Sequence, residues 1–112
     1  MKKNDEIYKS LKYELRKLAG AKNYTIKLTK ELKRLGGTCR YKDKYIVVVN
    51  SNLKEKDQII FIIDELLSRD NEIFHGQKLS ANLIQFLNDN NYKIKNFENF
   101  EMSDPIEKNG GI

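Results

Sequence analysis

Tryptophan is absent from this 112-residue sequence, which has only one cysteine, one histidine and one proline. A single cysteine excludes an internal disulfide and fits a reducing compartment. No apolar run approaches the roughly 18 residues that a membrane span requires. The N-terminal stretch MKKNDE is charged where a secretion signal would be apolar. We therefore expect a cytoplasmic protein that has no membrane contact.

Charge is unevenly divided along the chain. The net charge is +5, but residues 1–56 carry 16 Lys/Arg and 6 Asp/Glu, whereas residues 57–112 carry 5 and 10. A basic half can meet phosphates or an acidic protein surface. The simpler interpretation is that the lysines solvate helix faces and that the acidic half neutralises them within the same fold.

The first half of the chain is predicted to contain a helix, a short strand, a second short helix and a hairpin. Apolar residues at spacings of three and four indicate a helix over residues 4–20. Alternation at residues 24–28 indicates a brief strand, and the leucines that follow favour a helix of about two turns that ends at Gly36. Residues 38–41 and 45–49 are rich in β-branched and aromatic residues and are predicted to pair as a hairpin. The second of these strands is apolar on both faces, so we expect it to be central in the sheet.

Two further helices are predicted in the second half. Apolar residues cover most of the circumference of residues 53–70, which indicates a buried central helix. A short extended link, residues 71–74, leads to another helix over residues 78–90. Residues 1–95 are therefore expected to form a single small α+β domain, in which a β-hairpin or short antiparallel sheet packs against the central helix and two further helices. Residues 96–112 form an acidic C-terminal tail that we expect to be partly flexible.

The stretch YIVVVNSNLKEKDQIIFIIDELLSRD is distantly similar to the centre of the ImmA/IrrE family of bacterial metallopeptidases. In that family a strand ending in Asn leads through an acidic turn into a helix that carries His-Glu-x-x-His. The match places Asp64 at the first histidine, Glu65 at the glutamate and Ser68 at the second histidine. Two histidines at this spacing hold one zinc ion, and the glutamate between them acts as general base.

The zinc-binding residues of that motif are missing here. An aspartate offers at best one oxygen, a serine is a poor zinc ligand, and the lone His75 cannot rebuild the site. We therefore expect no metal, no cofactor and no enzyme activity. The degenerate motif is instead predicted to form the polar strip of an otherwise apolar helix. Glu65 and Arg69 stand four residues apart on that strip and can pair.

A second resemblance involves the hairpin and the helix that follows it. The stretch GGTCRYKDKYIVVVNSNLKEKDQIIFIIDELLSRD resembles a group of small uncharacterised bacterial proteins of similar length. They share a Gly-Gly-x-Cys-Arg start, a turn, an apolar strand ending near Asn or Asp, and a leucine-containing helix followed by Asp. The matching positions are Gly36, Gly37, Cys39, Arg40, Ile46–Asn50, Leu53, Leu66 and Asp70. This resemblance implies no known activity.

Cys39 is a candidate reactive thiol. Arg40 and Lys42 would favour its thiolate form if the side chain were exposed. A nucleophilic cysteine also needs a base, and His75 is the only histidine. The more ordinary interpretation is a small, buried strand cysteine. The glycine pair that precedes it, Gly36 and Gly37, is expected to stop a helix and turn the chain into the strand, since the Lys-Ser/Thr end of a phosphate-binding loop is missing.

Basic residues in the N-terminal half form a candidate binding surface. They are interleaved with tyrosines, and such a surface can hold phosphates without sequence preference and stack bases. The residues are Lys9, Lys12, Arg16, Lys27, Lys30, Lys33, Arg34, Arg40 and Lys42. No zinc-finger, RRM or KH signature accompanies them.

These observations favour a non-catalytic bacterial accessory protein of the cytoplasm. It would act through protein contacts, either with a partner or with a second copy of itself, by its basic face or its acidic tail. The first alternative is a nucleic-acid-binding regulator that uses the basic N-terminal half. The second alternative is chemistry that depends on Cys39.

Overall fold

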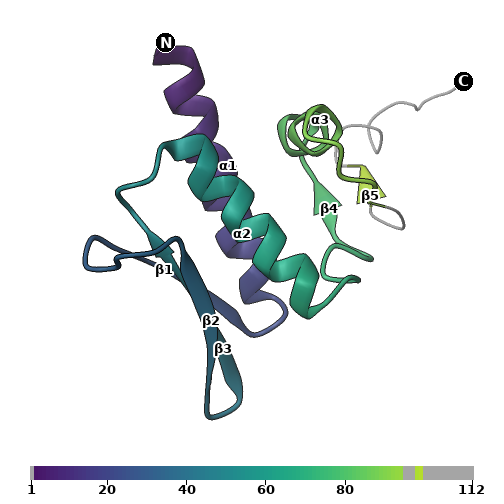
Figure 1. Cartoon of the computed structure of the whole chain (residues 1–112). Coiled ribbons are helices and arrows are strands. Elements are labelled where there is room, and N and C mark those ends of the chain that lie inside the picture. Colours follow the sequence, from purple (N-terminus) through teal and green to yellow (C-terminus); the bar gives the residue numbers. More distant parts are fainter. Residues whose placement is uncertain (1, 95–97, 100–112) are drawn as a thin grey trace, which may run out of the picture. The chain divides into compact units, whose positions relative to one another are not determined.

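The computed structural model describes residues 2–94 and 98–99 of the chain (Figure 1). The backbone divides into two units, Met1–Ile73 and Phe74–Ile112. The described residues contain three helices and a three-stranded mixed sheet, which confirms the predicted α+β class. In the same residues, no helix combines the length and the apolar character that crossing a membrane requires.

Helix α1 (Lys2–Gly20) opens the first unit where the leucine spacing predicts it. Leu11 and Leu15 are almost completely buried, because residues four apart share a helix face. Asp5 lies in the first turn and Lys17 in the last, the favourable arrangement of charges with the helix dipole. The helix therefore directs one apolar stripe into the first unit.

The sheet of the first unit has three strands, β1 (Tyr24–Thr29), β2 (Gly36–Tyr41) and β3 (Lys44–Asn50), in the order β1-β3-β2. Strands β2 and β3 form the predicted antiparallel hairpin. Strand β3 is central, as its continuous apolar run predicts. Strand β1 pairs with β3 in parallel along all six of its residues. The sheet is therefore mixed: the predicted antiparallel hairpin is present, and β1 adds a parallel strand to it.

Residues 30–35 join β1 to β2 without the helix that was predicted there. The Asn50 side-chain Nδ2 donates to the carbonyl oxygens of Leu32 at 3.4 Å and Arg34 at 2.9 Å. The Asn50 backbone N–H donates to the Leu35 carbonyl at 2.9 Å. In a helix, carbonyls accept bonds from the same segment. The prediction was wrong because the connection must pass the end of β3 to reach its other side, and Asn50 holds it there.

Helix α2 (Glu55–Arg69) is the predicted central helix. Ile59 and Ile63 are completely buried in it, and so are Val47 and Val49, which alternate along β3. Figure 1 shows α1 and α2 side by side against one face of the sheet. The core of the first unit therefore lies between this face and the two helices.

The second unit contains helix α3 (Ala81–Asp89), at the place predicted for it. The Ser80 hydroxyl accepts from the Leu83 backbone N–H at 3.2 Å and caps the helix. Residues 71–76 form turns, so the extended link predicted at 71–74 was wrong. Two short strands, β4 (Lys78–Leu79) and β5 (Glu98–Asn99), pair in parallel. Apart from β5, the predicted acidic tail lies outside the described residues.

Candidate functional site

The two faces of the sheet differ in what covers them. The Thr38 hydroxyl donates to the carboxylate Oε1 of Glu65 on α2 at 2.5 Å, so Thr38 faces the helices. Side chains alternate along a strand, so Cys39 faces the other way. Cys39 is exposed there, and within the described first unit both helices lie on the opposite face (Figure 1). We call the uncovered side the outer face.

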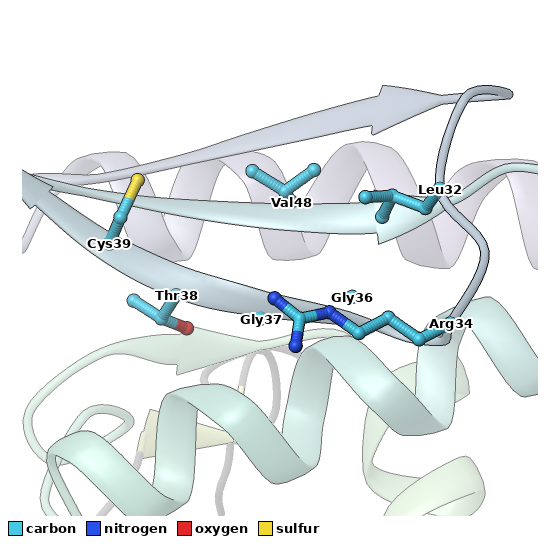
Figure 2. A pocket seen from close by; sticks show the side chains of 7 residues that line it. All are labelled: Leu32, Arg34, Gly36, Gly37, Thr38, Cys39 and Val48. Atoms are coloured by element: carbon cyan, nitrogen blue, oxygen red, sulfur yellow. The ribbon is translucent and has the colours of Figure 1, made fainter.

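A hollow of about 240 Å³, the outer cavity, lies on β2 and the loop before it. Figure 2 shows Cys39 and Val48 on neighbouring strands, with Leu32 near Val48 and the Arg34 side chain extended along β2 toward Gly37. A Cβ atom added to Gly37 would meet nothing within 4 Å. The cavity is therefore a mostly apolar space that Gly37 leaves open and that one guanidinium borders. Its lining residues are Leu32, Arg34, Gly36, Gly37, Thr38, Cys39 and Val48.

A second hollow, the helix-side cavity, measures about 210 Å³ and lies beside α2. Apolar side chains form most of its wall, and two carboxylates on the exposed side of α2 belong to the lining. Phe61 lines this cavity and also packs against Gly36, as shown below. The lining residues are Leu35, Leu53, Asp57, Ile60, Phe61 and Asp64.

Gly36 has no room for a side chain. Its φ is +145°, and an added Cβ would overlap the Val48 carbonyl oxygen and approach two carbons of the Phe61 ring to 2.9 and 3.0 Å. Gly36 is the first residue of β2, so the predicted helix stop and turn was wrong. Glycine is required here because the Phe61 ring and β3 both approach the backbone closely.

The outer edge of β2 has unpaired main-chain groups. Leu35 and Asn50 form a hydrogen-bonded pair just before the strand, and such pairs recur at every second residue of an antiparallel ladder. Gly37 and Cys39 therefore bond β3, while the intervening Thr38 directs its N–H and C=O outward. Consistently, the Thr38 carbonyl accepts from Arg69 of α2 at 3.4 Å. No strand in the described part of the chain pairs with this edge.

The two edges of the sheet are protected unequally. On β1, the Ile26 carbonyl accepts from the Arg16 Nη1 of α1 at 2.9 Å. On β2, the bond from Arg69 to Thr38 is 3.4 Å long and lies at the limit of a useful hydrogen bond. Natural sheets block their edges to prevent unwanted pairing. The β2 edge is therefore the more available of the two.

Glu65, one of the three residues aligned above with His-Glu-x-x-His, lies beside this edge. Glu65 accepts from the Thr38 hydroxyl, as described, and the Ser68 hydroxyl donates to the Glu65 carbonyl at 2.9 Å. Asp64 lines the helix-side cavity. Thr38 thus bonds both Glu65 and Arg69, the two residues that were expected to pair with each other. The described residues contain no group of three or more His, Cys, Asp or Glu placed to hold a metal ion.

Cys39 is exposed, so the prediction of a buried strand cysteine was wrong. The reason is its position, because β2 is an edge strand and residue 39 points to the outer face. His75, the base suggested for it, belongs to the second unit. The candidate thiol is therefore accessible and lines the outer cavity.

The nine candidate basic residues lie on two parts of the first unit. Lys12 on α1 donates to the Gln58 Oε1 at 3.0 Å and pairs with Glu55 at 3.3 Å. Arg16 binds the Ile26 carbonyl, as described. Lys9 is exposed on α1. The remaining six are exposed on the sheet and its loops: Lys27, Lys30, Lys33, Arg34, Arg40 and Lys42.

Three further residues lie beside the β2 edge; two of them, Leu35 and Phe61, had no predicted site role, and Tyr41 was considered only among the tyrosines of the basic surface. Leu35 and Tyr41, at the two ends of β2, are 55% and 60% exposed. Phe61 packs on Gly36. The sequence feature that could have indicated them is the pair of adjacent glycines in a strand, because glycine in a strand often marks a place where another group approaches the backbone closely.

Comparisons with known protein families, curated proteins and solved structures find no match to this chain. The two resemblances given above therefore stay predictions.

Proposed function

We propose that this protein is a non-catalytic interaction protein that binds an extended protein segment along the outer edge of β2. The observation that carries the proposal is the main-chain geometry of this edge. The Thr38 N–H and C=O point away from β3, and among the described residues a long bond from Arg69 is the one that reaches the carbonyl. An added strand would satisfy these groups with main-chain hydrogen bonds, as in other cases of strand addition.

The two cavities support the same mode of binding. Side chains of an extended segment alternate between its two sides. One set would face the outer cavity, which Arg34 borders, and the other set would face the helix-side cavity, which Asp57 and Asp64 line. Main-chain bonds would supply affinity, and the cavities would supply specificity.

The residues of the degenerate motif favour binding over catalysis. Glu65 accepts a hydrogen bond from Thr38, which ties α2 to β2. Ser68 bonds within its own helix. These contacts give the polar strip of α2 a structural role beside the edge. The proposal keeps the bacterial cytoplasm as the place of action, where a single exposed thiol such as Cys39 stays reduced.

The nine candidate basic residues are divided between α1 and the sheet with its loops, which favours a protein partner over a nucleic acid. A phosphate backbone is bound by several cations that act together. Here Lys12 and Arg16 are engaged on α1 by side-chain and backbone acceptors. Arg40 lies on the edge strand β2 itself, and Arg34 lines the outer cavity beside it.

The test uses random peptides displayed on phage and the variants Arg40→Pro and Arg40→Ala. Residue 40 has the same parity as Thr38, so its N–H points outward and proline removes no bond to β3. Peptides selected on the native chain should bind Arg40→Ala and lose binding to Arg40→Pro. Bound peptide should also slow hydrogen exchange at the amides of residues 38 and 40. Peptides that bind both variants equally, with no protection at β2, would refute the proposal.

A further inference from the structure

We infer that the segment that pairs with this edge is β2 of a second copy of the same chain, so that two copies form a symmetric dimer through an antiparallel β2–β2 contact. The inference rests on the proposed function and names its partner. A two-fold contact uses the same surface on both copies, so this surface must complement itself. The residues along β2 meet that requirement in one register.

The parity of the edge limits the possible registers. Only residues that point outward, at 36, 38 and 40, can form hydrogen-bonded pairs with a new strand. An antiparallel pairing with its two-fold axis at Thr38 places Thr38 opposite the partner's Thr38. It places Gly36 opposite the partner's Arg40 and Gly37 opposite the partner's Cys39. Each glycine of one copy therefore faces a larger residue of the other.

On the helix side, Gly36 leaves a place for the partner's Arg40. The Phe61 ring lies against Gly36, and Asp64 shares the helix-side cavity with this ring. A guanidinium in that position would lie near an aromatic ring and reach a carboxylate, both of which favour arginine. Arg40 is exposed in the single chain, where its Nε donates to the Lys42 carbonyl at 3.2 Å. The charges at this contact are complementary.

On the outer face, Gly37 leaves a place for the partner's Cys39. A Cβ atom at Gly37 would meet nothing within 4 Å, so this part of the outer cavity is open. The same register brings Leu35, which lines the helix-side cavity just before β2, level with the partner's Tyr41. These are two of the four large hydrophobic side chains that are exposed in the described residues. Covering both with a partner strand would remove apolar surface from water and stabilise the contact.

Arg69 occupies the centre of this contact in the single chain. Its Nη2 lies 3.4 Å from the Thr38 carbonyl, which the partner's Thr38 N–H would bond in the dimer. The two donors compete for one outward carbonyl. Removing the guanidinium should therefore strengthen the dimer. A dimer that used another surface would not respond in this way.

The experiment measures the dissociation constant of the full-length chain by sedimentation velocity over a range of concentrations. The native chain should show a reversible monomer–dimer equilibrium. Gly37→Val should raise the dissociation constant by at least about tenfold, because it fills the space opposite the partner's Cys39. Arg69→Ser should lower it by about threefold to tenfold, the effect of removing one competing hydrogen bond. Circular dichroism on both variants checks that the fold is kept.

A spin label on Cys39, the chain's only cysteine, reports the register. In the proposed pairing the two copies of residue 39 are diagonal neighbours, about 7–8 Å apart. The frozen dimer should therefore show strong dipolar broadening, which dilution with unlabelled chain should remove. A Ser68→Cys, Cys39→Ser variant, labelled on α2, serves as the matched control and should show weaker broadening.

The outcomes separate this inference from the proposed function. A chain that stays monomeric at every concentration but binds selected peptides at β2 overturns the dimer and leaves the function in place. A dimer that ignores both substitutions and shows no broadening at residue 39 uses another surface and also overturns the inference. A monomer that binds no peptide overturns both.

Discussion

Replacing Gly36 with alanine should lower the free energy of unfolding by about 4 kcal/mol, from two contributions. The φ of +145° is a conformation that side-chain-bearing residues rarely adopt, and holding one there costs about 1–3 kcal/mol. The new Cβ would also overlap the Val48 carbonyl oxygen and press on the Phe61 ring. Overpacking of this kind costs about 1–3 kcal/mol more. Since Val48 belongs to the central strand, neither cost can be relieved by moving a loop.

The assay is urea denaturation followed by circular dichroism, at a concentration at which the chain is monomeric. Gly37→Ala is the matched control, because the added Cβ meets nothing within 4 Å and the backbone φ is not in the positive range. The control should leave stability unchanged or raise it by about 0.4–1 kcal/mol through the unfolded state. Two neighbouring glycines should thus differ by about 4 kcal/mol in their response to the same substitution.

A second variant locates the cause of the Gly36 effect. Phe61→Leu removes the ring atoms that approach Gly36, so in its background Gly36→Ala should be less costly by about 1 kcal/mol or more. The remaining cost would come from φ and from Val48. Equal losses from Gly36→Ala and Gly37→Ala, or a loss below about 1 kcal/mol for Gly36→Ala, would refute the close approach of α2 and β3 to this residue.

Three further predictions concern contacts of the first unit. Thr38→Val removes the hydroxyl that donates to Glu65 at 2.5 Å and should lower stability by about 1–2 kcal/mol in urea denaturation, but by much less in a Glu65→Leu background. Gln58→Met leaves two loop carbonyls without the donor that now lies 2.8 and 3.3 Å away; it should cost about 2–3 kcal/mol in the same assay, and a neutral result would contradict the role of this buried amide. Burial, with a smaller contribution from Asp70, raises the pKa of Tyr24. Folding therefore favours the neutral phenol, and its contribution to the free energy of unfolding should be fully present below pH about 10. This contribution should be lost as the pH rises through the raised pKa. In a measurement of stability against pH, Tyr24→Phe should abolish that loss.

Elements with a strong local pattern were predictable from the sequence. The leucine stripe of α1 and the apolar surface of α2 indicate helices because residues three and four apart share a face. Leu11, Leu15, Ile59 and Ile63 are buried as that pattern requires. The hairpin followed from two β-rich runs with a short turn, and its second strand was central because both faces are apolar.

Features that depend on distant residues were not predictable. The leucines of residues 30–35 have helical spacing, but Asn50, 16 and 18 residues away, bonds the carbonyls of Arg34 and Leu32. The parallel pairing of β1 with β3 likewise has no local signal, since it depends on how the connection crosses the sheet. Tertiary contacts decide such segments over local preference.

Exposure of Cys39 has a related explanation. A small apolar residue in a strand is most often buried, and the sequence contains no mark of which sheet face the helices cover. Thr38 and Cys39 are adjacent and point to opposite faces, so burial of one implies exposure of the other when only one face is covered. The hydrogen bond from Thr38 to Glu65 determines which of the two meets α2.

Gly36 and Gly37 are identical in sequence but have different physical reasons to be glycine. The space around Gly36 is occupied by Phe61 and Val48 of its own chain. A side chain at residue 36 should therefore lower the free energy of unfolding whatever the oligomeric state. The space around Gly37 is open, so the single chain should tolerate a side chain there. Its effect should be seen only in the binding of another strand. If Gly37→Val destabilised the monomer as much as Gly36→Ala, the open space at residue 37 would be part of the core packing and would not be a surface for a partner. The two positions therefore test the fold and the interface separately within one strand.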